Sequence, residues 1–199
     1  MTAITATPQT LDRHGLDIAR VFKQAWRLFA DDIGPLLIGT LIACILSVLT
    51  IGILAGPLVA GLYGMVVGRV RDGRRPQVGD VFAGFDRFGA YFVAALVLVV
   101  LIGLASITIV GGFLLATIWI YVFPLMVDRR MGLGEAMKTS KDMVLEGGFW
   151  EHLALIIVFA VISAVADGLL GLLATPFMIV AVTVAYYLTA GRGDEVERA

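Results

Sequence analysis

Charged residues are scarce in this sequence, and three long stretches have almost none. Charged residues make up 16% of the 199 residues and apolar residues 59%, whereas soluble domains average about 25% and about 45–50%. Residues 33–68 and 88–127 contain no Asp, Glu, Lys or Arg, and residues 153–191 contain only Asp167. About 20 helical residues cross a bilayer core, so each stretch suffices for two crossings. The scarcity of charge excludes a soluble globular domain and predicts a polytopic membrane protein.

Cysteine and histidine are also rare, which excludes several kinds of site. Cys44 is the only cysteine, so neither an intramolecular disulfide nor a zinc site built on thiol pairs can form, and its apolar surroundings predict a buried, inert thiol. His14 and His152 lie in different segments, and neither HExxH nor GxxxxGK[ST] occurs. We therefore expect no catalytic residue, no metal and no cofactor. At Glu151 and His152 a proton or metal site is the weaker alternative to a solvated interface pair.

The first 32 residues carry too many charges for a secretory signal peptide. Such a signal needs an apolar core of about 7–15 residues, and residues 1–32 contain none. We therefore expect the first membrane segment to act as an uncleaved anchor, preceded by a flexible tail over residues 1–14. From Leu16 to Ala30, apolar residues recur at helical spacing and basic residues occupy the other face, which predicts an amphipathic helix.

An amphipathic helix followed by an uncharged stretch is predicted three times. A second such helix is predicted between Pro76 and Phe88 and a third between Leu133 and Glu146, because apolar residues in both recur at intervals of three and four. We therefore predict an all-α integral membrane protein with six transmembrane helices. These helices form three repeated units, each a cytoplasmic amphipathic helix and a transmembrane hairpin.

The chain is too short for an additional soluble domain, so we predict one membrane domain over residues 1–199. The units are residues 15–70, 77–128 and 133–191, and the polar tail is residues 192–199. The hairpins are expected to turn near Gly52 to Pro57, at Gly111-Gly112, and near Ala174 to Phe177, which resembles the sequence Ala55 to Leu58 at the first turn.

The distribution of basic residues predicts the orientation. All 15 Lys and Arg lie in the N-terminal region, residues 69–87, residues 128–151 or the C-terminal tail, and the hairpin turns between the spans have none. Positively charged loops remain on the cytoplasmic side. We therefore expect both termini and all three amphipathic helices to be cytoplasmic.

Three sets of residues are candidates for functional contacts. Asp167, inside an apolar stretch, is either an ion or proton contact or an ordinary carboxylate of the far loop. Gly61, Gly64 and Gly68 form a small-residue stripe that serves either internal helix packing or an oligomer face. Basic residues near the membrane surface are candidates for lipid headgroup contacts: Arg20, Lys23, Arg27, Arg71, Arg74, Arg75, Arg129 and Arg130. For the clusters at residues 69–75 and 128–130, the alternative is that the charges serve membrane topology alone.

Three short segments carry a resemblance to a known family: Val81 to Phe85 (VFAGF), Phe123 to Asp128 (FPLMVD) and Gly134 to Ser140 (GEAMKTS). They resemble a poorly characterised group of bacterial inner-membrane proteins, which includes YciC-like proteins and the membrane domain of some glycerophosphodiester phosphodiesterases. The resemblance covers about residues 20–190 and implies a multi-pass protein of the bacterial cytoplasmic membrane. In fused members the phosphodiesterase domain performs the chemistry, so the resemblance implies no enzymatic activity for this sequence.

These observations predict a non-enzymatic scaffold or accessory protein. Its cytoplasmic amphipathic helices would contact lipid headgroups, chiefly anionic ones, or a protein partner, and the glycine stripe would support a homo-oligomer; no nucleic acid partner is expected. The alternative is a small transporter, channel or lipid-moving protein, because internal repeats are common in transporters. A single carboxylate in the apolar stretches argues against a pathway for charged solutes and favours a neutral or lipidic substrate.

Overall fold

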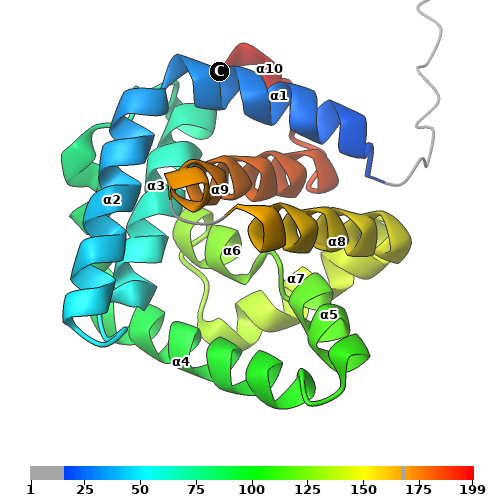
Figure 1. Ribbon diagram of the computed structural model, residues 1–199. Helices are drawn as coiled ribbons and strands as arrows, with labels where there is room; N and C mark the ends of the chain where they lie inside the picture. Colours follow the sequence, from blue (N-terminus) through cyan, green and yellow to red (C-terminus); the bar gives the residue numbers. More distant parts are fainter. Residues whose placement is uncertain (1–15, 167–168) are drawn as a thin grey trace, which may run out of the picture.

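The computed structural model describes residues 16–166 and 169–199, and every regular element in these ranges is a helix (Figure 1). The elements are α1 (Ile18–Asp31), α2 (Ile33–Leu49), α3 (Ala55–Asp72), the 3₁₀ helix η1 (Val78–Arg87), α4 (Phe88–Ala105), α5 (Ile109–Ile118), α6 (Val122–Asp128), α7 (Leu133–Glu146), α8 (Phe149–Val165), α9 (Leu169–Thr189) and α10 (Gly193–Arg198). The all-α prediction is confirmed for these ranges. The predicted flexible tail, residues 1–14, lies outside them.

Three helical segments are long and apolar enough to cross a membrane: Val78–Ala105, Ile109–Asp128 and Leu170–Thr189. The number rises to five if α1 with α2, and α7 with α8, each count as one bent span. The outward faces suit lipid, because α2, α4 and α8 expose Leu, Ile and Val along their length. The length and composition of these helices are consistent with a membrane protein.

Sharp bends separate α1 from α2 and α7 from α8, and each has a local cause. α1 and α2 meet at 89°. Pro35 lies in the first turn of α2, where a helix tolerates its missing N–H, but in a continuous helix its ring would clash with the carbonyl of Asp31. α7 and α8 meet at 108°, and Gly148 between them has a φ of 99°, a left-handed conformation that glycine adopts readily.

Of the three predicted hairpin turns, the first is correct and the other two are wrong. Residues 50–54 form the first turn, where the sequence predicts it, and Gly52 there has a φ of 82°. The third turn was expected at Ala174 to Phe177, which is wrong because Pro176 lies inside α9. α8 already ends at Val165. In lipid a helix tolerates an internal proline when neighbouring helices pack around it.

The second turn lies at residues 106–108 and not at Gly111-Gly112. The hydroxyls of Ser106 and Thr108 donate to carbonyls at the end of α4, at 2.7 and 3.1 Å, and so help to end that helix. Gly111 and Gly112 lie in the first turns of α5, where a methyl group on either would overlap the turn residues. The glycines are therefore needed for close packing beside the turn.

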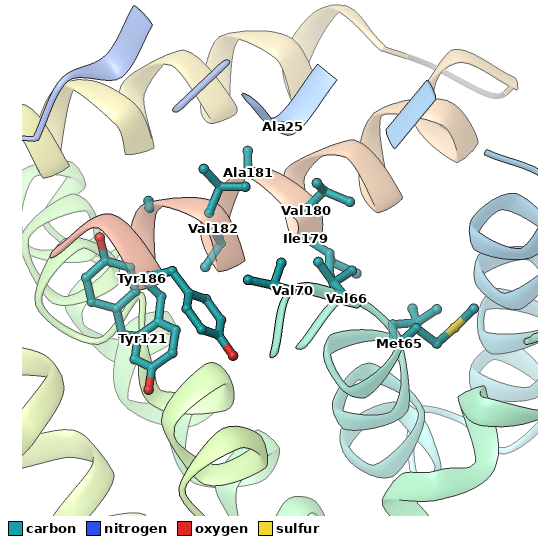
Figure 2. Packing of buried hydrophobic residues seen from close by; sticks show 14 of the residues in the cluster. Ala25, Met65, Val66, Val70, Tyr121, Ile179, Val180, Ala181, Val182 and Tyr186 are labelled. Carbon is teal, nitrogen blue, oxygen red and sulfur yellow. The ribbon is translucent and has the colours of Figure 1, made fainter. Parts of the chain in front are cut away.

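The C-terminal half of α9 is the centre of the bundle (Figure 2). All residues from Ile179 to Tyr187 are buried. Ala25 of α1 and Val66 of α3 belong to the same apolar cluster, so α9 is covered from two sides. Helix α4, by contrast, buries only Tyr91, Ala94 and Leu98 and faces outward with the rest.

Helix η1 packs directly on the backbone of α3. A methyl group at Gly61 would overlap the carbonyl of Val81 in η1, and one at Gly84 would overlap the carbonyl of Pro57 in α3. Such close contact between two backbones is open only to glycine. Of the two roles expected for the glycine stripe, Gly61 therefore has the first: it serves internal helix packing.

Gly61→Ala is expected to lower the free energy of unfolding by about 1–3 kcal/mol, because the added methyl must push η1 off α3. Gly64→Ala is the matched control on the same helix, since its methyl would meet no atom closer than 3.9 Å. Thermal unfolding in detergent, followed by tryptophan fluorescence, compares the two. Equal midpoints would contradict the η1 packing.

Cys44 lies on the outer face of α2 and is exposed, so the prediction of a buried thiol is wrong. Leu41, Ile45 and Val48 are exposed on the same helix. The buried residues of α2 lie on its other side: Leu36, Gly39, Thr40 and Ala43. A helix that is apolar all round gives no pattern that separates its packed face from its lipid face.

A nitroxide label on Cys44 in a lipid bilayer is expected to collide with oxygen, which dissolves in acyl chains, and to be shielded from a water-soluble nickel chelate. The reverse pattern is expected for the control, a label on Glu197→Cys in a Cys44→Ser background, because Glu197 is exposed at the charged end. Power-saturation spectroscopy measures both accessibilities. Free collision of the nickel chelate with the Cys44 label would show that α2 does not face lipid.

Candidate functional site at the charged end of the bundle

Asp128, the last residue of α6, is the centre of a buried polar cluster. Its side chain is 3% exposed. The carboxylate accepts hydrogen bonds from the hydroxyls of Tyr186 (2.8 Å) and Tyr187 (3.3 Å) and from the guanidinium of Arg192 (2.7 Å). The guanidinium of Arg71 lies 3.4 Å from the same carboxylate. One acidic side chain therefore joins α3, α6, α9 and the segment after α9.

Arg192 neutralises this cluster and is itself held from several sides. It donates to the carboxylate of Glu195 at 2.7 and 2.9 Å, and its guanidinium carbon lies 4.6 Å from the centre of the Tyr187 ring. Hydrogen bonding to Glu195 first, and then to Asp128, raises the pKa of Arg192 above its usual value. Arg192 therefore stays charged, and the buried carboxylate keeps the partner that its burial requires.

His152 belongs to a second buried polar cluster, formed by α8, α9 and the segment before α6. Its Nδ1 lies 2.6 Å from the carbonyl oxygen of Gly148, and its Nε2 lies 2.8 Å from the hydroxyl of Tyr121, which is 3.1 Å from that of Thr189. A carbonyl only accepts, so Nδ1 carries a proton and donates to Gly148, while Nε2 is hydrogen-bonded to the hydroxyl of Tyr121. The prediction of a solvated Glu151–His152 pair is wrong, because His152 is fully buried.

Ser140 of α7 forms hydrogen bonds with backbone groups at the break between α5 and α6. The helix is interrupted between Ile118 and Tyr121. The Ser140 hydroxyl donates to the carbonyl of Ile118 (2.8 Å) and accepts from the backbone N–H of Tyr121 (3.2 Å). An unpaired backbone group in lipid costs several kcal/mol, so this one side chain makes the break tolerable there. Tyr121, at the break, is the residue that contacts His152.

A polar contact also bridges the charged ends of each predicted hairpin. The contacts are Asp32 to Arg69 (2.9 Å), Asp86 to Arg130 (3.2 Å) and His152 to Thr189 (3.4 Å). The first is well buried, with 7% and 16% of the two side chains exposed, whereas the second is open to solvent. The two ends of every pair are therefore at the same level of the molecule.

Most basic residues predicted to contact lipid headgroups are paired within the chain. Arg20 binds the carboxylate of Glu197, and Arg27 donates to the carbonyl of Val196 at 2.8 Å, so both hold α1 to α10. The other pairs are Arg71 with Asp72 and Asp128, Arg74 with Asp80, and Arg130 with Asp86. Lys23, Arg75 and Arg129 form no ion pair with another described residue.

Comparison with known proteins was made at the level of families, sequences and structures. No protein-family model, no curated protein and no solved structure matches this chain. The resemblance to the YciC-like group stays a prediction, and the interpretation of function rests on the chain's own geometry.

An apolar recess of about 510 Å³ lies between α5, α8 and α9. Phe113, Phe159 and Met178 contribute to its walls, and the hydroxyl-bearing residues Ser106 and Ser163 are its polar lining. The volume falls within the range of about 300–1,000 Å³ that is typical of ligand pockets. The recess therefore suits a hydrocarbon chain better than a polar solute.

A smaller, polar recess of about 240 Å³ lies at the charged end, between α3, η1 and α6. Gly64 and Gly68 form part of its floor, and Gly68 is covered by the side chain of Arg74, 3.2 Å from where a methyl group would lie. The middle of the glycine stripe thus borders a recess. Gly61 is covered by η1 and Gly68 by Arg74, so these two glycines have no free surface for contact with a second copy of the chain.

The two buried clusters are arranged to hold helices together. Asp128 is occupied by four donors, and both ring nitrogens of His152 are engaged, so neither is free to take a proton from a substrate. Within residues 16–166 and 169–199, no three His, Cys, Asp or Glu residues are grouped to hold a metal ion. Asp167, the predicted ion or proton contact, lies outside the described residues.

Sequence reasoning missed the partners of Asp128, although one signal for them was present. Tyr186 and Tyr187 end the last apolar stretch, and Asp128 ends the one before it. Buried tyrosine hydroxyls usually find a partner, and with six spans these ends lie on the same side. At this span end the sequence interpretation covers only the basic residues Arg129 and Arg130, and it overlooks the donors that a buried carboxylate needs.

Asp128→Asn is expected to lower the free energy of unfolding by about 2–4 kcal/mol, because it removes the charge that Arg192 and Arg71 neutralise. Asp86→Asn is the matched control, and should cost at most about 1 kcal/mol because Asp86 and Arg130 are 46% and 74% exposed. Denaturant titration in mixed micelles measures both. Similar losses for the two variants would refute the central role of Asp128.

Proposed function

We propose that the chain crosses the membrane six times, through α2, α3, α4, α5 with α6, α8 and α9. The polar bridge at the charged end of each hairpin supports this arrangement, because adjacent antiparallel spans bring their ends to one side. The two described turns between spans, residues 50–54 and 106–108, carry no charge. Under the positive-inside rule the charged end, with both termini, faces the cytoplasm. The proposed location is the bacterial cytoplasmic membrane.

We further propose that the protein is a non-enzymatic scaffold or accessory protein. The observation that carries this proposal is that the polar side-chain atoms of Asp128 and His152 are hydrogen-bonded to other groups of the same chain. A rigid, internally satisfied end suits a platform for lipid or protein contacts. The bends of 89° and 108° support the proposal too, since they turn α1 and α7 across the ends of the spans that follow them, along the membrane surface.

Helix α1 supplies the best surface for such contacts. Arg20 and Arg27 fasten it to α10, while Lys23 and Trp26 are exposed. Trp26 is 63% exposed, and tryptophan is enriched at the headgroup level of membranes. Lys23 forms no ion pair with the residues that the structure describes. This lysine beside an exposed tryptophan is the proposed contact for an anionic headgroup, with a protein partner as the other occupant.

The apolar recess favours one alternative, a lipid-moving protein. Its position between α5, α8 and α9 would place it against acyl chains if these helices span the bilayer. None of the described residues that line it is charged, so a hydrocarbon chain is the ligand that this lining suits. A lipid mover accelerates exchange of lipids between leaflets, whereas a scaffold that only holds a chain there does not.

The headgroup proposal is tested with Trp26 as the only tryptophan, in the variant Trp119→Phe with Trp150→Phe. Brominated phosphatidylglycerol is expected to quench Trp26 more strongly than brominated phosphatidylcholine at equal mole fraction. One cation near the surface contributes about 1 kcal/mol, so Lys23→Glu should remove a preference of about fivefold. High salt should weaken the preference in the unmodified protein.

Lys138→Glu is the control, because Lys138 is exposed on α7 and changes the net charge equally. It should leave the quenching of Trp26 unchanged. Equal quenching by the two lipids would refute headgroup contact by α1. In the same vesicles, rapid reduction of fluorescent lipid from both leaflets by dithionite would replace the scaffold proposal with the lipid-moving one.

A further inference from the structure

Helix η1 has three faces, and each meets a different environment. A 3₁₀ helix has three residues per turn, so residues three apart lie in line. Val81 is on the face buried against α3. Ala83 and Asp86, on the second face, line the polar recess. Phe82 and Phe85, on the third face, are 45% and 37% exposed, so the recess has an exposed apolar strip as its neighbour.

This strip continues from η1 into the helix that follows. Phe82, Phe85, Phe88 and Phe92 form a row in which each ring centre lies 6.0 Å from the next. The row runs within Val78–Ala105, one of the segments long and apolar enough to span a membrane. It therefore leads from the charged end toward the depth of acyl chains.

The polar recess carries charges of both signs. The charged residues that line it are Arg71, Asp72, Arg74, Asp86 and Arg130. All five lie where solvent reaches them, and Arg130 is 74% exposed. Guanidinium groups bind phosphate in the strongest hydrogen-bond geometry that proteins offer, and carboxylates accept from an ammonium group. The lining thus suits a ligand that has a phosphate and an ammonium group together.

The size of the recess limits the ligand further. Its volume of about 240 Å³ lies below the range of about 300–1,000 Å³ for drug-sized ligands, so a compact polar group fits and acyl chains must lie elsewhere. The recess is open above Gly64, because a methyl group added there would come no closer than 3.9 Å to another side chain.

We infer that this recess binds the headgroup of a membrane phospholipid with a phosphate and a primary ammonium group, while the phenylalanine row lies along its acyl chains. Arg74 and Arg130 hold the phosphate through the guanidinium N–H groups that their pairs with Asp80 and Asp86 do not use. Asp86 accepts from the ammonium with the carboxylate oxygen that Arg130 does not contact. A trimethylammonium group cannot donate a hydrogen bond to Asp86, and a purely anionic headgroup supplies no ammonium group to it. The inference rests on the proposed insertion in a membrane and names a site separate from α1.

Native mass spectrometry of the full chain tests the inference. The protein in detergent is mixed with equal amounts of phosphatidylethanolamine, phosphatidylcholine and phosphatidylglycerol that share the same acyl chains. One hydrogen bond to a charged group is worth about 1.5–3 kcal/mol, so the ethanolamine lipid should be retained at least about tenfold over the choline lipid. Equal retention, or a preference for phosphatidylglycerol, overturns the inference.

Two variants locate the site. Asp86→Asn should abolish the preference for ethanolamine over choline, whereas Asp194→Asn, which removes an exposed carboxylate on α10, should keep it. Gly64→Leu should fill the recess and lower the retention of all three lipids. If that variant loses its melting transition, Asp86→Asn alone decides, and an unchanged preference in Asp86→Asn overturns the inference.

Two further measurements separate the possible failures. Soluble glycerophosphoethanolamine, at a concentration equal to that of the lipid, should fail to displace the bound phospholipid. Displacement would show that the recess binds a free phosphoester, and would overturn the inference that its ligand is a membrane lipid. Alkaline carbonate extraction of cell membranes tests insertion independently. Extraction of the protein would refute the proposed function, whereas an inserted protein without the ethanolamine preference would refute only the recess.

Discussion

The carboxylate of Asp128 is the interaction on which the arrangement of the helices depends. It receives Arg71 from α3 and Tyr186, Tyr187 and Arg192 from α9 and the segment after it, so it joins α3, α6 and α9. Hydrocarbon outside a bundle is as apolar as leucine, so helix association in lipid needs packing and polar contacts. A charge buried at one level of the bundle supplies such a contact, and it fixes the ends of α3, α6 and α9 in register.

A second constraint follows from the backbone. Where α5 gives way to α6, Ser140 binds the carbonyl of Ile118 and the N–H of Tyr121, so α7 is required for the break to exist. The break in turn sets the position of Tyr121, which contacts His152 and lies 6.0 Å, between ring centres, from Tyr186. The two buried clusters are thus coupled through one tyrosine, and a change in α7 should be felt at Asp128.

The sequence predicted the helical class and the first turn, because local residues decide them: Gly52 acts on its own backbone. Pro35 and Gly148 act in the same local way at the bends before α2 and α8, although the sequence pattern predicted no bend there. It failed where a partner distant in the chain decides. Cys44 lies in a run that is apolar on every side, so no pattern could separate lipid face from packed face. His152 follows charged residues and looked solvated, yet the hydroxyl of Tyr121 from another hairpin buries it. At the second turn, glycines that permit close packing were mistaken for the turn itself.

Pairing within the chain also narrows where lipid or a partner can bind. A basic residue counts toward orientation whether or not it is paired, since the positive-inside rule responds to position, whereas recognition requires a charge that remains accessible. Arg20 and Arg27 bind α10, and Arg192 binds Asp128. These three arginines therefore add little to the recognition of a lipid or a partner. The surface beside α1 keeps Lys23, which is exposed and has no ion-pair partner among residues 16–166 and 169–199. The recess beside η1 keeps guanidinium and carboxylate groups at a solvent-open wall. A scaffold of this kind would be rigid at the centre of its charged end and would recognise headgroups at its edges.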